Sequence, residues 1–169
     1  MKKIQKHLIR SCIILWNYKL NLVDRTIRYQ GAIIQYDHLL LIKHQEHESR
    51  REYWILPGGG RESDESEEDC IKRELQEETG LNVSVERRLL DDADVPMGPY
   101  KHLKTYLCKI VSGQAKPGYE PEVEAANLYA ITEVRWFNLK NTSEWENLVE
   151  SGPVTHAIVQ RIRSILGYS

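Results

Sequence analysis

Glu74, Glu77 and Glu78 stand at a spacing that would gather their side chains on one face of a helix. They belong to the segment 59–81, GGRESDESEEDCIKRELQEETGL, which holds nine acidic residues in a chain whose net charge is only −2. Each like-charge pair at this spacing costs about 0.2–0.5 kcal/mol of helix stability. A divalent cation would make the same arrangement favourable, and carboxylate oxygens suit hard ions. We therefore expect these glutamates to bind Mg²⁺, with Mn²⁺ as the second choice, although a solvated acidic face is the simpler reading of three glutamates alone.

The residues around the glutamates predict the helix that would carry them. Ser63 or Asp64 can cap its start, acidic residues fill its first turn, and Gly80 follows its end. Ile71 and Leu75 fall on the arc beside the glutamates, so they should face a sheet. Three glycines precede the helix, and they would let the main chain approach closely and offer a backbone carbonyl to a cation.

The remaining segments alternate between strand and helix patterns. Apolar and β-branched residues predict strands, and a proline start with helical apolar spacing predicts a helix near the C-terminus. Such a mixture packs as a mixed sheet with helices on its faces, which is an α/β fold. The segments expected are two strands within 26–45 joined by a turn at 36–38, a charged loop at 46–54, strands at 81–91 and 102–111, a polar loop at 112–130, a strand at 133–139 and a helix at 153–167.

Composition narrows the class of protein. A chain of 169 residues with 41% hydrophobic and 28% charged residues suits one globular domain, and a pI of about 6.3 predicts no general attraction to nucleic acid or anionic membranes. Three widely separated cysteines argue against a disulfide framework and for a reducing cytoplasm. The apolar run at 12–16 is too short to span a bilayer. We expect residues 1–24 to form an extension packed on a domain at 25–169.

The acidic segment as a whole resembles the signature of the Nudix hydrolases, the MutT-like family, and every defined position of that signature is filled: Gly59-x5-Glu65-x7-Arg73-Glu74-Leu75-x-Glu77-Glu78-x-Gly80-Leu81. The resemblance implies an α/β/α sandwich around a central mixed sheet. It further implies a metal-dependent hydrolase that breaks the diphosphate bond of a nucleoside diphosphate derivative, either an ADP-ribose-like molecule or a nucleoside triphosphate. A domain that binds such a molecule as a sensor without cleaving it is the alternative.

The resemblance also implies roles for individual residues. Glu74, Glu77 and Glu78 would hold the metal, with the carbonyl of Gly58 beside them. Arg73 would orient the acidic side chains, and Glu65 would brace the loop against the helix. The general base is left open among Glu77, Glu122 and Glu120, in that order of preference, and the last two would come from the polar loop.

Substrate contacts are expected outside the glutamates. Gly59 and Gly60 would line the diphosphate, and Tyr53 and Tyr100 would stack on a base, with Tyr106 and Tyr119 as further candidates. For each tyrosine taken singly, a half-buried position in a strand is the simpler reading. His44 and His47 form a short HxxH without a third ligand and are expected to be solvated, and Cys70 is expected to pack. The expected partner is a small nucleotide derivative, with no membrane and no nucleic acid, and a homodimer is left open.

Overall fold

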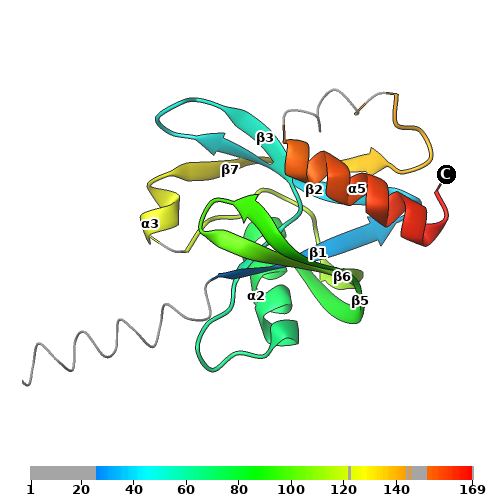
Figure 1. Ribbon diagram of the computed structural model, residues 1–169, viewed down its shortest axis with the longest axis horizontal. Helices are drawn as coiled ribbons and strands as arrows, with labels where there is room; N and C mark the ends of the chain where they lie inside the picture. Colours follow the sequence, from blue (N-terminus) through cyan, green and yellow to red (C-terminus); the bar gives the residue numbers. More distant parts are fainter. Residues whose placement is uncertain (1–25, 122, 144, 146–151, 169) are drawn as a thin grey trace, which may run out of the picture.

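The computed structural model describes residues 26–121, 123–143, 145 and 152–168, so the predicted N-terminal extension at 1–24 lies outside the described residues (Figure 1). Strands and helices follow one another as the mixed pattern of the sequence predicts. They are β1 (Ile27–Gln35), β2 (His38–Glu46), β3 (Glu52–Ile55), β4 (Gly58–Gly60), α2 (Glu67–Thr79), β5 (Leu81–Met97), β6 (Tyr100–Gly113), α3 (Val123–Ala126), β7 (Tyr129–Asn138) and α5 (Pro153–Leu166).

The seven strands form one mixed sheet with β1 near its centre. Along the main path the order is β3-β2-β1-β6-β5, while β4 pairs with β1 and β7 pairs with β2. The β1–β6 pair is parallel, and the other pairs are antiparallel. The predicted α/β class with a central mixed sheet is therefore confirmed.

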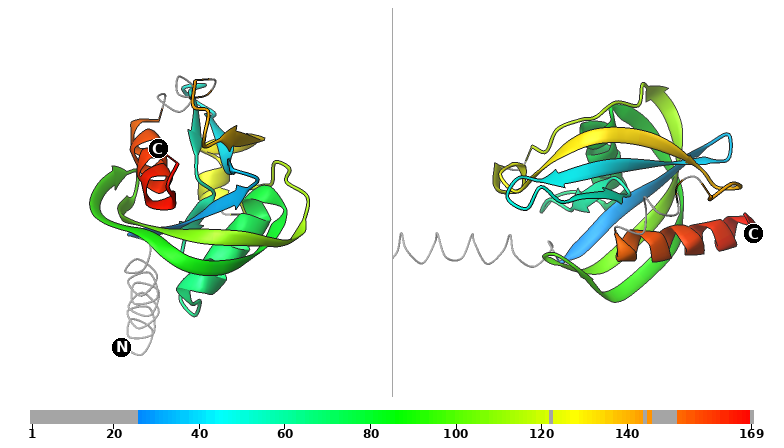
Figure 2. Two further views of the ribbon diagram at one scale, coloured as in Figure 1. Left: turned by 90° about the vertical axis from the view of Figure 1, so that its right-hand side faces the viewer. Right: turned by 90° about the horizontal axis from the view of Figure 1, so that it is seen from above.

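Two hydrophobic cores lie on opposite faces of the sheet, because successive side chains of a strand point to opposite sides. In β2, Leu39 and Leu41 contribute to one core, and Leu40 and Ile42 contribute to the other. The first core is covered by α5, and the second is covered by α2. Figure 2 shows the two helices on opposite sides of the strands, which is the α/β/α arrangement.

Pairing extends several strands beyond their predicted limits. β3 forms inside the expected charged loop at 46–54, where it pairs with β2, and β5 continues to Met97 because β6 runs beside it. The glycines at 58–60 were expected to interrupt regular structure, yet they form β4 along β1. Gly58 has φ of 149°, and a Cβ there would lie 2.1 Å from the Tyr29 carbonyl oxygen, so this pairing depends on glycine.

Helix α2 begins slightly later than predicted. Ser66 is the N-cap instead of Ser63 or Asp64, and its hydroxyl oxygen accepts a hydrogen bond from the Asp69 amide at 3.1 Å. Gly80 ends the helix as expected, with φ of 71° and its amide donating to the Gln76 carbonyl. Among the described helices, none has both the length and the apolar character needed to cross a membrane.

Candidate active site

Helix α2 turns its glutamates toward the edge of its buried face. Glu74 and Glu78 are only 7% and 2% exposed, whereas the side chain of Glu77 is 16% exposed. Ile71 and Leu75 beside them are fully buried against the sheet, as the helical spacing predicts. The burial of the two carboxylates follows from this anchoring, since Glu74 and Glu78 lie three residues beyond Ile71 and Leu75 respectively.

Arg73 connects the acidic side chains through its planar guanidinium group. Its Nη1 donates to Glu74 Oε1 at 2.9 Å and to Glu77 Oε2 at 3.1 Å. Its Nε and Nη2 donate to the two carboxylate oxygens of Glu65 at 2.8 and 3.0 Å, and Nη2 also reaches the Gly60 carbonyl oxygen at 3.1 Å. A fork of fixed donors suits such a task, because it sets the orientation of several carboxylates at once.

The glycine strand β4 lies directly against the buried carboxylates. The Gly58 amide donates to Glu78 Oε2 at 2.6 Å. A Cβ on Gly59 would lie 2.4 Å from Glu74 Oε1, so the carboxylate occupies the space that any other residue would fill with its side chain. The main chain of the glycines therefore approaches the carboxylates closely, as expected. The group of Gly58 that contacts Glu78 is its amide.

Burial raises the pKa of both inner carboxyl groups. The pKa of Glu74 rises to about 7, with the nearby Arg73 opposing the rise, and the pKa of Glu78 rises well above its ordinary value. Arg28 on β1 supplies the facing positive charge. Burial alone would lower the pKa of Arg28, but Glu78, Tyr100, Tyr129 and Glu74 together outweigh that effect and raise the pKa.

These oxygen donors fit a hard divalent cation, since two buried carboxylates that resist ionisation gain most when a cation stabilises their charged forms. Within the described part of the chain, no three His, Cys, Asp or Glu side chains already converge as a metal site. Arg73 instead holds Glu74 and Glu77 by the same nitrogen. A cation that bound all three glutamates would have to compete with part of this arginine network.

The polar segment after β6 is fastened to the C-terminal end of α2. The amides of Lys116, Gly118 and Tyr119 donate to the carbonyls of Thr79, Glu78 and Glu77, at 3.0, 2.9 and 3.2 Å. This segment delivers Glu120, which is half-buried and whose negative charge acts on Glu74 and Glu78. Among the proposed bases, Glu77 is bound by Arg73, Glu120 lies near the inner carboxylates, and Glu122 lies outside the described residues.

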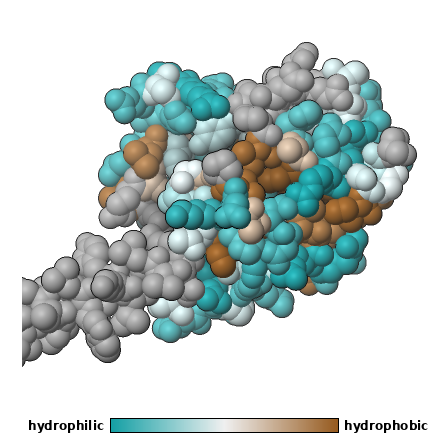
Figure 3. Space-filling view, in the orientation of Figure 1, coloured by the Kyte–Doolittle hydropathy of each residue, from teal (hydrophilic) through white to brown (hydrophobic). Residues whose placement is uncertain are grey.

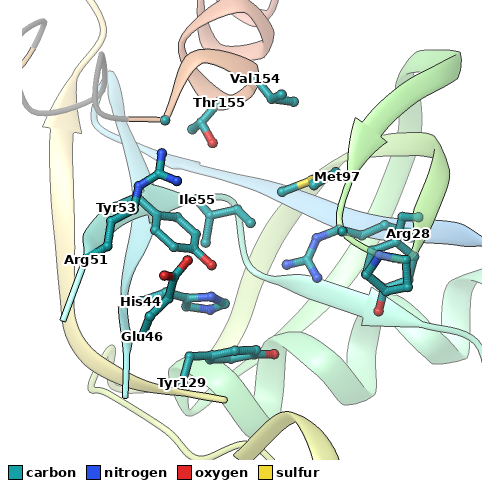
Figure 4. A pocket seen from close by; sticks show the side chains of 14 residues that line it. Arg28, His44, Glu46, Arg51, Tyr53, Ile55, Met97, Tyr129, Val154 and Thr155 are labelled. Carbon is teal, nitrogen blue, oxygen red and sulfur yellow. The ribbon is translucent and has the colours of Figure 1, made fainter. Parts of the chain in front are cut away.

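A pocket of about 390 Å³ is lined by Arg28 and His44, two residues that also adjoin Glu78. Tyr53 and Tyr100 line it as expected for stacking residues, together with Arg28, Arg51 and Tyr129 (Figure 4). Figure 3 shows several hydrophobic patches on the face seen in Figure 1, with hydrophilic side chains between them. A flat, partly apolar ligand with a negatively charged group suits such a lining.

Two other tyrosines do not line this pocket. Tyr106 donates its hydroxyl to Glu67 at the start of α2, and Tyr119 is 65% exposed on the surface. The interpretation of these two as base-stacking residues therefore finds no support in the geometry.

His44 differs from the expectation for the HxxH pair. It is 3% exposed, lies in β2, and places Nε2 at 4.0 Å from Glu78 Oε1, whereas His47 hydrogen-bonds the Ala126 carbonyl. Burial and the neighbouring Arg28 lower the pKa of His44 to about 3, so the contact with Glu78 is not an ion pair. The alternation that puts Leu40 and Ile42 on one face of β2 also puts His44 there, and that signal could have revealed its burial.

Arg28 and Tyr129 were absent from the predicted site. Both line the pocket, and Arg28 faces the inner carboxylates as well. Their positions depend on pairing between distant strands, since β1 meets β4 and β7 meets β2. The sequence carries no local signal for either contact.

The fold and the site together define an α/β/α protein with an acidic centre on one helix and an aromatic pocket beside it. A family profile described as the NUDIX domain matches residues 26–151, so the chain belongs to the Nudix family. Its fold resembles that of a NUDIX hydrolase from Nitrosomonas europaea, with a TM-score of 0.64 and 17% identity over 82% of this chain and 88% of that one.

Two curated relatives match parts of the chain. The NAD-capped RNA hydrolase NudC of Vibrio parahaemolyticus is 25% identical over 77% of this chain and 44% of its own length. YjhB of Bacillus subtilis, provisionally named an ADP-ribose pyrophosphatase, is 31% identical over 54% of this chain and 44% of its own length. The aligned part of this chain thus spans less than half the length of either relative.

Proposed function

We propose that the chain is a pyrophosphohydrolase that breaks the diphosphate bond of a nucleoside diphosphate derivative. The observation that carries the proposal is the contiguity of two features: the acidic centre and the aromatic pocket share Arg28, which lines the pocket and faces Glu78. A substrate with a base or sugar in the pocket would thereby bring its phosphates to the glutamates. The names of the two curated relatives both describe cleavage of nucleotide derivatives, which supports the same reaction class.

The metal assigned to the site is Mg²⁺, with Mn²⁺ as the second choice, and its ligands would be Glu74, Glu77 and Glu78 with the carbonyl of Gly58. When bound, such an ion neutralises the diphosphate and lowers the pKa of water. The chain's own contribution is to hold the carboxylates in place. Arg73 does so from one side through its bonds to Glu74 and Glu77, and the Gly58 amide does so from the other through Glu78.

Glu120 is the residue we assign as general base, because it follows the segment bonded to the end of α2 and its negative charge acts on both inner carboxylates. It would accept the proton of the attacking water. Glu77 is the second candidate, since its carboxylate is held in an ion pair with Arg73 at 3.1 Å. Replacement of each by glutamine separates the two assignments.

The pocket favours substrates in which the diphosphate carries an aromatic base, such as ADP-ribose-like molecules or nucleoside triphosphates. Tyr53 and Tyr100 supply aromatic faces, and Arg28 and Arg51 supply positive charge. Of Gly59 and Gly60, the partly exposed Gly60 is the one we propose as a contact of the diphosphate, because the Glu74 carboxylate fills the space beside Gly59. We also propose a cytoplasmic location, in keeping with the free thiols of Cys70 and Cys108.

The test is a turnover screen of the full chain with Mg²⁺ against ADP-ribose, nucleoside triphosphates, dinucleoside polyphosphates and NAD-capped RNA. Released nucleotide and phosphate are separated by chromatography. We expect cleavage of at least one substrate, its loss with EDTA, and its recovery with added Mg²⁺. Glu78→Gln should lower kcat by about 100-fold or more, on the scale of removing a group that stabilises the transition state.

Glu68→Gln is the matched control, because Glu68 lies on the same helix but is exposed and pairs with Lys72. It should leave turnover unchanged. Tight binding of ADP-ribose with no cleavage of any substrate would contradict the proposal and favour the sensor function. Full activity in Glu78→Gln would contradict the metal role.

A further inference from the structure

Tyr129 makes a direct bond to the residue assigned as general base. Its hydroxyl donates to Glu120 Oε2 at 2.6 Å. Burial and the adjacent carboxylate raise the pKa of Tyr129, so the hydroxyl keeps its proton and is the donor. A hydrogen bond from a neutral hydroxyl to a carboxylate fixes the orientation of that carboxylate.

Glu120 is held at its other side by the main chain. The segment that precedes it is bonded to the carbonyls of Glu77 and Glu78 through the amides of Tyr119 and Gly118. A Cβ on Gly118 would lie 1.8 Å from the Glu77 carbonyl oxygen, so only glycine permits this contact. The backbone therefore brings Glu120 to the acidic centre, where Tyr129 bonds to its carboxylate.

Tyr129 is itself rigidly placed. It is the first residue of β7, where it pairs with Glu46 of β2. Its ring stacks on His44 at a centroid distance of 4.2 Å and an angle of 14°, and Figure 4 shows the two rings one above the other. His44 is buried and lies next to Glu78. The ring of Tyr129 is thus held in the sheet against His44, and its hydroxyl bonds to the Glu120 carboxylate on the loop.

We infer that Tyr129 is a positioning residue, which orients the Glu120 carboxylate toward the acidic centre. Tyr129 also lines the pocket, so one side chain contacts both the proposed substrate pocket and the proposed base. This inference rests on the proposed function, since Glu120 needs a fixed orientation only if it accepts a proton during hydrolysis. Its consequence is specific: loss of the hydroxyl should impair the chemical step through Glu120 and leave binding in the pocket intact.

The test is a double-mutant cycle on the full chain with Tyr129→Phe and Glu120→Gln, using the best substrate of the screen. Tyr129→Phe keeps the ring that stacks on His44 and removes only the hydroxyl. A hydrogen bond to a charged group corresponds to about tenfold in rate or more, so we expect kcat to fall by about tenfold with KM unchanged within about twofold. If Tyr129 acts through Glu120, the double variant should match Glu120→Gln alone within about twofold.

Tyr168→Phe is the matched control, because Tyr168 donates the same kind of bond to Asp37 at 3.0 Å, away from the pocket. It should leave kcat and KM unchanged. Equal thermal melting of the variants and the wild type shows that the fold is retained. An active wild type with unchanged kcat in Tyr129→Phe, or losses that multiply in the double variant, overturns this inference alone. A wild type without turnover overturns the proposed function and this inference with it.

Discussion

The backbone amide of Gly58 donates a hydrogen bond of 2.6 Å to Oε2 of Glu78, and both residues are buried. The bond joins the glycine strand β4 to helix α2 across a separation of 20 residues. It stabilises the charged form of a carboxyl group whose burial otherwise raises its pKa. The glycine-rich segment therefore sets the position of one proposed metal ligand.

The first prediction concerns the space behind Glu74. Gly59→Ala would place a methyl group 2.4 Å from Glu74 Oε1, and this overlap must displace the carboxylate or the strand. We expect the affinity for Mg²⁺ to fall by about tenfold or more, since overpacking costs about 1–3 kcal/mol. Isothermal titration with Mg²⁺ measures the change.

The control for that substitution is Gly167→Ala. Gly167 ends α5 with φ of 79° and has open space around its Cα, so alanine there strains only the local backbone. It should lower the free energy of unfolding by about 1 kcal/mol and leave Mg²⁺ affinity unchanged. Wild-type Mg²⁺ affinity in Gly59→Ala would remove Glu74 from the proposed ligands.

The acidic helix was predictable because its information is local. The spacing of Glu74, Glu77 and Glu78, the apolar positions of Ile71 and Leu75, and the final glycine all lie within one segment. The N-cap was misplaced by three residues or fewer, since several polar residues before the helix could cap it and only Ser66 is placed to do so.

The pocket was less predictable because strand pairing assembles it. Arg28 lies near Glu78 because β4 pairs with β1, and the chain then continues from β4 into α2. Tyr129 stacks on His44 because β7 pairs with β2. No short-range pattern encodes these registers. Glu120 could be suggested from its distance along the chain, but its location depends on the contact of Gly118 with the end of α2.

The second prediction concerns Arg73. Lysine keeps the positive charge but cannot donate to Glu65, Glu74 and Glu77 together. We expect Arg73→Lys to lower kcat by about tenfold to 100-fold and the free energy of unfolding by about 1–3 kcal/mol, because hydrogen bonds to charged groups are lost. Steady-state kinetics and urea denaturation measure the two effects.

Lys72→Met is the control for Arg73→Lys. Lys72 neighbours Arg73 on the helix but forms an exposed pair with Glu68 at 2.6 Å. Its loss should change the free energy of unfolding by less than about 0.5 kcal/mol and leave kcat intact. If Arg73→Lys lowers stability while each folded molecule retains wild-type kcat, the arginine has no part in orienting the site.

The third prediction concerns pH and the start of α2. Partial burial alone would raise the pKa of Glu67, but hydrogen bonds from Lys104 and Tyr106 of β6 outweigh it and lower that pKa below 4.5. A carboxyl group whose pKa is lower in the folded state adds stability above its unfolded pKa, and this stability disappears as pH falls through the folded pKa. Glu67 should therefore stabilise the protein at neutral pH and lose this effect below pH 4.5.

Glu67→Gln tests this sign. The variant should be less stable than the wild type at pH 7, by about 1 kcal/mol as expected for a solvent-screened hydrogen-bonded pair. The difference between the two proteins should shrink as pH is lowered from 4.5, and urea denaturation across that range measures it. A difference that grew at low pH would contradict the lowered pKa.

The fourth prediction concerns Arg28, the residue that the acidic centre and the pocket share. Its guanidinium Cζ lies 5.7 Å from the centre of the Tyr100 ring, and Nη2 donates to the Leu56 carbonyl oxygen at 3.2 Å. Its buried Nε has no hydrogen-bond partner within the described residues, and the side chain lines the pocket, so we expect the guanidinium to turn toward a phosphate of bound substrate. Arg28→Lys keeps the charge that faces Glu78 and removes the fork. We expect KM to rise by about tenfold or more, since hydrogen bonds to charged groups contribute about 1.5–3 kcal/mol.

Arg135→Lys is the control for Arg28→Lys. It alters a cation 5.1 Å from the Trp54 ring, outside the pocket, and should leave KM unchanged. Steady-state kinetics compares the two variants, and an unaltered KM in Arg28→Lys would show that the substrate phosphates do not reach Arg28.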